Sequence, residues 1–83
     1  MTLNSLKIGE YAKVKRVSTD GLTRERLKML NVFVGAKIRL LKSSFFGRTY
    51  LIVADGVRLG IRKSTAEKIF VEPNEISSDG IQR

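Results

Sequence analysis

The stretch LKMLNVFVGAKIRLL, residues 27–41, changes its hydrophobic period within a few residues. Leu27 and Leu30 are three residues apart, which is the spacing of one face of a helix. Further along, Ile38 and Leu40 alternate with basic residues, which is the period of a half-buried strand. The stretch therefore predicts a helix that ends and a strand that begins shortly afterwards.

The residues between these two periods indicate how the chain makes the change. Asn31 tolerates the left-handed backbone conformation that ends many helices, second only to glycine. Gly35 supplies a second turn position, and we expect Val32 and Val34 to anchor the connection in the core. The joint is predicted to be a helix C-cap followed by a tight turn into a strand.

Upstream, the segment STDGLTRERLKMLN predicts a helix of two to three turns. Thr23 is a candidate N-cap, and Leu27 and Leu30, with Leu22, form the expected buried stripe. A helix this short is not stable alone in water, so it must pack on a sheet.

Strand patterns surround the joint on both sides. Ala12 and Val14 alternate with lysines, but Val17 is out of phase, so we expect a β-bulge or a bend near Lys15 and Arg16. TYLIVA and VRLGIR, residues 49–54 and 57–62, flank Asp-Gly, the strongest signal for a two-residue hairpin turn. STAEK, with Ser64 as its cap, predicts a helical turn before a last strand, IFV.

These elements predict a mainly β, small α+β fold. We expect an SH3-like, partly open five-stranded barrel with a short helix between strands 1 and 2 and a helical turn before strand 5. The predicted domain covers residues 1–72, and residues 73–83 form a polar tail that we expect to be disordered.

The charge is strongly positive and unevenly distributed. Residues 1–71 hold 15 Lys and Arg against five acidic residues, while the net charge of the whole chain is +8. A basic body attracts nucleic acid, anionic lipid headgroups or an acidic protein surface, or it serves only to keep a small barrel soluble.

The sequence contains few of the residues that catalytic sites and metal sites need. The chain has no His and no Cys, the residues that most often serve iron sites and nucleophile–base pairs. The acidic residues are scattered among lysines and arginines, and no phosphate-binding glycine motif occurs. We therefore expect no enzyme activity, no catalytic residues, no resident cofactor and no tight metal site.

The segment SSFFGR, residues 43–48, is the main candidate for partner binding. Two adjacent aromatic side chains, Phe45 and Phe46, cannot both point into one core layer, and Arg48 lies beside them. Aromatic and Arg residues are enriched in binding hot spots. Leu41, which breaks the outward basic series, is a further candidate; for all of these, packing within the fold is the alternative.

The ordered motifs of residues 6–71 resemble the FeoA family. They are Leu-x-x-Gly at residues 6–9, Arg-x-x-x-Leu at 26–30, Gly-x-x-Ile at 35–38, Leu-x-Ile-Arg at 59–62 and Ala-x-x-Ile-x-Val at 66–71. The same module is similar to the C-terminal domain of iron-dependent repressors. The chain departs from the family where it has Asn31 and Val34, and in its loop without proline.

The resemblance implies a small accessory protein of ferrous iron uptake. Its partner would be an FeoB-type membrane permease with a cytosolic GTP-binding domain, and Fe(II) association is implied by the resemblance only. We expect a cytoplasmic protein, because no secretory signal or apolar run long enough to span a membrane is present. A homo-oligomer formed through exposed strand edges stays open.

Two other functions remain as alternatives. The first is a basic small barrel that binds nucleic acid through the series Lys13, Lys15, Arg16 and Lys37, Arg39, with Tyr11 and Tyr50 as stacking platforms. The second is a ligand-sensing regulatory domain detached from a repressor.

Overall fold

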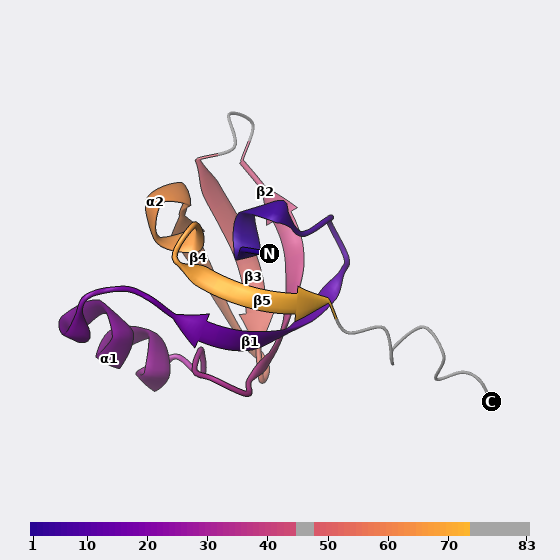
Figure 1. Ribbon diagram of the computed structural model, residues 1–83. Helices are drawn as coiled ribbons and strands as arrows, with labels where there is room; N and C mark the ends of the chain where they lie inside the picture. The colour runs from indigo at the N-terminus through magenta and orange to yellow at the C-terminus, as the bar shows by residue number, and fades with distance from the viewer. Residues whose placement is uncertain (45–47, 74–83) are drawn as a thin grey trace.

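The computed structural model describes residues 1–44 and 48–73. One antiparallel sheet of five strands, in the order β4-β3-β2-β1-β5, forms most of the molecule (Figure 1). The elements are η1 (Leu3–Ser5), β1 (Tyr11–Val17), α1 (Gly21–Met29), β2 (Lys37–Ser43), β3 (Thr49–Ala54), β4 (Val57–Arg62), α2 (Lys63–Ala66) and β5 (Ile69–Pro73).

The sheet curls into a barrel that stays open between β4 and β5, as the sequence predicts. The strands β1 and β5 cross in front of β2 and β3, and α1 projects from one side (Figure 1). The N-terminal segment extends the β5 edge, where the Val71 amide donates to the Met1 carbonyl at 2.8 Å and Thr2 bridges Phe70. The β5 strand runs to Pro73, which the sequence pattern assigns to the tail, and the rest of the predicted tail, residues 74–83, lies outside the described residues.

Small and branched apolar side chains fill the interior. Leu3, which the sequence did not single out, is fully buried, whereas Ile8 is 65% exposed. The other buried side chains of the core are Leu6, Ala12, Val14, Val17, Leu27, Val32, Ala36, Ile38, Leu40, Tyr50, Ile52, Ala54, Ile61, Ala66, Ile69 and Val71.

The end of α1 is a Schellman motif, and it confirms the role predicted for Asn31. Asn31 has φ of 70°, its amide donates to the Lys28 carbonyl at 3.0 Å, and the Val32 amide donates to the Leu27 carbonyl at 2.8 Å. Leu27 and Val32 are both buried and form the apolar contact that accompanies this motif.

Other local predictions around α1 are wrong. Asp20, not Thr23, is the N-cap, and its carboxylate accepts from the Thr23 amide at 3.4 Å. Leu22 and Leu30 are exposed, because α1 contacts the barrel only through the face that carries Leu27. Val34 is 63% exposed and does not anchor the connection.

The turn before β5 also differs in detail. Helix α2 begins at Lys63, its N-cap is Arg62 and no side chain caps it, so Ser64 does not have the predicted role.

Two irregularities break the alternation of the strands. The register of β1 and β5 shifts between Val14 and Arg16, which confirms the predicted bulge and returns Val17 to the core. A second shift lies between Leu40 and Lys42 in β2, and it leaves the intervening Leu41 half-buried. At the β3–β4 turn, Asp55 and Gly56 have φ of 51° and 81°, as a type I′ turn requires.

Candidate partner-binding surface at the α1–β2 connection

Four exposed apolar side chains gather where α1 ends and the chain turns toward β2. We call them the joint patch: Met29, Leu30, Phe33 and Val34, which are 81%, 42%, 43% and 63% exposed. A small soluble domain seldom exposes large apolar side chains in a cluster unless another molecule contacts them.

The helix end itself places these residues outside. The Schellman motif directs Leu27 and Val32 into the core, so the residues beside them in sequence point away from it. The chain changes direction between α1 and β2 within a few residues, because the backbone is left-handed at Asn31 and has a second positive φ, 96°, at Gly35. Phe33 and Val34 are thus held on a short, well-defined connection.

A groove adjoins the joint patch on the side of β1 and α1. Its volume is about 450 Å³, and it is lined by Arg16, Val17, Arg24, Lys28, Val32, Phe33 and Val34. Three of these residues are cationic, the other four are apolar, and none is acidic. The groove therefore suits an apolar side chain with carboxylates nearby.

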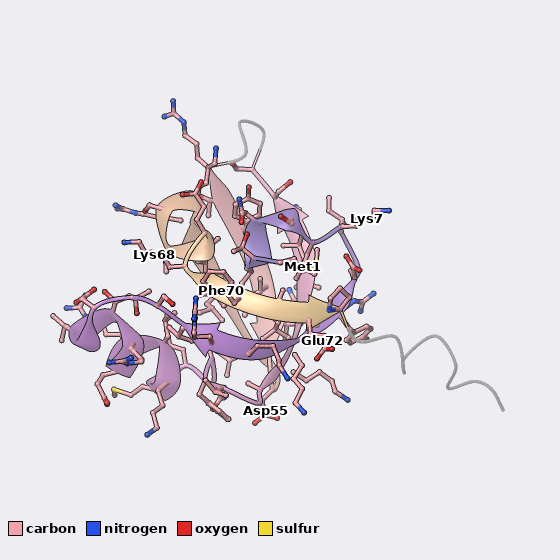
Figure 2. The ribbon with its side chains drawn as sticks, viewed as in Figure 1. Met1, Lys7, Asp55, Lys68, Phe70 and Glu72 are labelled. Atoms are coloured by element: carbon pink, nitrogen blue, oxygen red, sulfur yellow. The ribbon has the colours of Figure 1, made fainter. Side chains whose placement is uncertain are left out.

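An aromatic contact holds one of these cations in position. The guanidinium carbon of Arg16 lies 4.5 Å from the centroid of the Phe70 ring, and the two residues are partners in the β1–β5 register. Figure 2 labels Phe70 on β5, beside β1. A cation–π contact of this kind restricts a long side chain that would otherwise move freely in solvent.

A second cleft, of about 490 Å³, lies on the other side of Phe33. It extends from Asn31 and Phe33 past Lys37 to the β3–β4 turn at Asp55, which Figure 2 labels at the end of the sheet. Tyr11 and Arg39 also line this cleft. The Arg39 guanidinium covers the Tyr11 ring at 5.0 Å, and its Nε donates to the Gly9 carbonyl at 3.2 Å.

The partner-binding residues predicted from the sequence lie elsewhere or outside the described residues. Phe45 and Phe46 are outside them. Arg48 is exposed and directly precedes β3, and its amide donates to the Ser44 hydroxyl at 2.8 Å. It lies where β2 ends and β3 begins, which is the end of these strands away from the joint patch. Leu41 lines neither cleft. Their roles stay predictions.

Sequence reasoning missed the joint patch, although a signal was present. Three consecutive apolar residues, Val32 to Val34, occur where a helix has ended and no strand has begun. A short connection cannot bury all three side chains on one side of the backbone. One buried and two exposed residues is the arrangement that the structure has.

The side chains present do not fit a metal site. The chain has no His and no Cys, and in residues 1–44 and 48–73 no three acidic side chains gather into a possible ligand group. The expectation of no resident metal stays a prediction. The same part of the chain contains no helix that is both long and apolar enough to cross a membrane.

Topology and surface together define a small SH3-like domain, an open five-stranded barrel with a helix inserted between its first two strands. The FeoA domain family model matches residues 1–73, and the chain belongs to this family. It is thus a member of a family involved in ferrous iron transport.

Solved structures agree with this assignment. The FeoA protein of Chlorobium tepidum is 33% identical, with a TM-score of 0.84 over 88% of this chain and 70% of that one. Stenotrophomonas maltophilia FeoA, solved with zinc and described as a prokaryotic SH3 domain protein and a candidate activator of ferrous iron transport, is 26% identical. Its TM-score is 0.72 over 87% of this chain and 89% of its own.

The same fold occurs within a larger protein. ScaR with bound zinc is 26% identical and has a TM-score of 0.75 over 87% of this chain, but this chain spans only 36% of ScaR. No curated protein sequence matches the chain significantly.

Proposed function

We propose that this chain is a cytoplasmic accessory protein of ferrous iron uptake. It docks through the joint patch and the adjoining groove onto the cytosolic part of an FeoB-type permease, and thereby assists or regulates transport. Iron is the permease's cargo in this account, and the chain itself contributes neither a catalytic residue nor a resident cofactor.

The exposure of Phe33 beside a cationic groove is the observation that carries the proposal. A half-exposed aromatic ring next to branched apolar side chains is the type of residue that dominates protein–protein binding energy. Family membership supplies the context in which such a contact would operate.

The charges of the groove indicate what the partner carries. Arg16, Arg24 and Lys28 surround its apolar residues without a carboxylate among the lining side chains. A segment with a Leu- or Phe-type side chain flanked by Asp or Glu complements both properties. Charges at the edge of an interface mainly change the rate at which two partners associate. The cations of the groove should therefore raise the association rate more than they lower the dissociation rate.

The nucleic-acid alternative gains no support from the tyrosines that it would need. Tyr50 is buried, and the Tyr11 ring is already covered by the Arg39 guanidinium. Base stacking on Tyr50 would require a rearrangement of the fold, and stacking on Tyr11, which is 37% exposed, would compete with Arg39 for the ring.

A titration against the purified cytosolic domain of the permease tests the proposal. The double variant Phe33→Ser/Val34→Ser should bind at least about tenfold more weakly, since truncating one hot-spot residue typically costs more than 1 kcal/mol. Ile8→Ser is the matched control, because Ile8 is as exposed as Val34 but lines neither cleft. Equal affinity for all three proteins would contradict the docking surface, and no saturable binding by the native chain would contradict the proposed function.

A further inference from the structure

The outer face of the sheet carries a second surface feature, separate from the joint patch. Cross-strand partners share a face of a sheet, so the register shows which side chains lie together. Tyr11, Arg39, Val53 and Arg58 form one continuous row across β1, β2, β3 and β4. The row on one side runs from Glu72 of β5 through Lys13 to Lys37.

The rows on the other side continue the same pattern. Lys42 lies opposite Leu51, which lies opposite Gly60, and Thr49 lies opposite Arg62. We call the six cations of these rows the basic sheet face: Lys13, Lys37, Arg39, Lys42, Arg58 and Arg62. All are exposed except Arg39, which is half-buried.

Acidic side chains are few on this face: in the described strands, Glu72 of β5 lies directly opposite Lys13. Strands β1 to β4, all of them described, contain no Asp or Glu. Glu72, on the neighbouring β5, lies 3.5 Å from Lys15 through its Oε1. Asp55 lies in the turn beyond the end of the strands.

The arrangement carries an electrostatic penalty within the fold. Lys13 and Lys37 are directly opposite each other, and like charges at that position destabilise a sheet. Arg39 and Arg58 are two strands apart in their row, with Val53 between them, which at a strand spacing of about 4.8 Å separates their backbones by roughly 10 Å. An anionic surface laid against the face would remove this repulsion.

We propose that the basic sheet face binds the surface of an anionic phospholipid bilayer. The cations come from three strands, β1, β2 and β4, and the half-buried Leu51 and Val53 of β3 lie between those of β2 and those of β4. A bilayer matches such a spread of charge because its headgroups move to meet each cation, whereas an acidic protein would need carboxylates placed to fit. Stacking of single-stranded bases on this face would have to use Tyr11, and the Arg39 guanidinium lies over that ring.

This inference does not rest on the proposed permease docking. The joint patch and the basic sheet face meet at the cleft that Phe33 shares with Lys37 and Arg39. The domain can therefore lie on a bilayer through the sheet while the joint patch remains available to a partner at that membrane.

Vesicle sedimentation tests the inference directly. The native chain is mixed with vesicles of phosphatidylcholine alone and with vesicles of equimolar phosphatidylcholine and phosphatidylglycerol, and we expect binding only to the anionic vesicles. Each Lys or Arg near an anionic surface raises the partition coefficient roughly fivefold. The variant Lys13→Gln/Lys37→Gln/Arg58→Gln should therefore bind on the order of 100-fold more weakly.

A variant with the same net charge is the control. Lys7→Gln/Arg26→Gln/Lys68→Gln removes three exposed cations that are not on the face, and Lys7 and Lys68 lie on opposite sides of the molecule in Figure 2. At about 0.15 M salt the Debye length is near 8 Å, so charges off the face contribute little and the control should bind like the native chain. Circular dichroism confirms that both variants are folded.

Three outcomes would overturn the inference. The first is absence of binding to anionic vesicles by the native chain. The second is an equal loss in both triple variants, which would assign the effect to net charge rather than to the face. The third is binding to a single-stranded oligonucleotide that the face variant abolishes while vesicles are not bound, which would assign the face to nucleic acid. Since no permease is present, none of these outcomes depends on the proposed docking.

Discussion

The Arg16 guanidinium lies 4.5 Å from the centroid of the Phe70 ring, so β5 positions a cation of the groove beside the joint patch. Arg16 directly follows the register shift of β1, and this shift places it opposite Phe70. A packing detail of the barrel thus orients a side chain on the candidate docking surface.

This pair should be measurably coupled. A double-mutant cycle with Arg16→Met and Phe70→Leu is expected to give a coupling energy of about 0.5–1 kcal/mol, the range for a cation over an exposed aromatic ring. Urea unfolding of the four proteins measures it. Additive effects of the two substitutions would show that the contact contributes nothing.

The backbone at Asn31 makes a second prediction. Because its φ is 70°, Asn31→Ala should lower the free energy of unfolding by about 1–2 kcal/mol, the penalty for a Cβ in the left-handed region. Asn31→Gly should keep or raise stability. Denaturant titration distinguishes the two, and equal effects would contradict the Schellman ending of α1.

The N-terminal segment offers a matched pair of substitutions. Leu3 is fully buried and Ile8 is 65% exposed, so Leu3→Ala should cost about 2–5 kcal/mol. Ile8→Ala should stay within about 0.5 kcal/mol of the native chain. Thermal or urea unfolding provides the comparison. A small effect at Leu3 would mean that η1 does not belong to the core.

Asp20 predicts a pH dependence of the start of α1. The hydrogen bonds from Thr23 lower the pKa of the Asp20 carboxyl below its ordinary value of 3.8. The stabilisation is therefore present above the unfolded pKa and is lost as the pH falls through the lower folded pKa. Asp20→Ala should reduce Tm at neutral pH, and the difference should shrink when the pH falls below about 4. A difference that does not change with pH would assign the cap to something other than the carboxylate.

Most of the fold was predictable because local chemistry and burial agree along the strands. The alternation around Ile38 and Leu40, the Asp55-Gly56 turn and the left-handed Asn31 each specify a backbone state on their own. An irregularity near Arg16 was also predictable, since Val17 needed a bulge or a bend to reach the core, and the structure has the bulge.

The errors arose where tertiary packing decides between local options. The spacing of Leu27 and Leu30 does not tell whether the buried face of the helix includes both residues or only one of them. In the structure the barrel covers only Leu27. Leu41 could not be placed from the pattern because its position depends on a bulge that no residue type marks. The joint patch was missed for the same reason, since its exposure follows from how little of α1 the barrel contacts.

The most direct test of the docking account is an NMR titration of the isotopically labelled chain with the unlabelled cytosolic domain of the permease. The account predicts that amide shifts concentrate on residues 29–34 and on the groove residues of β1 and α1. Shifts concentrated on residues 44–49, with the joint unchanged, would contradict it and assign docking to the segment that contains Phe45 and Phe46.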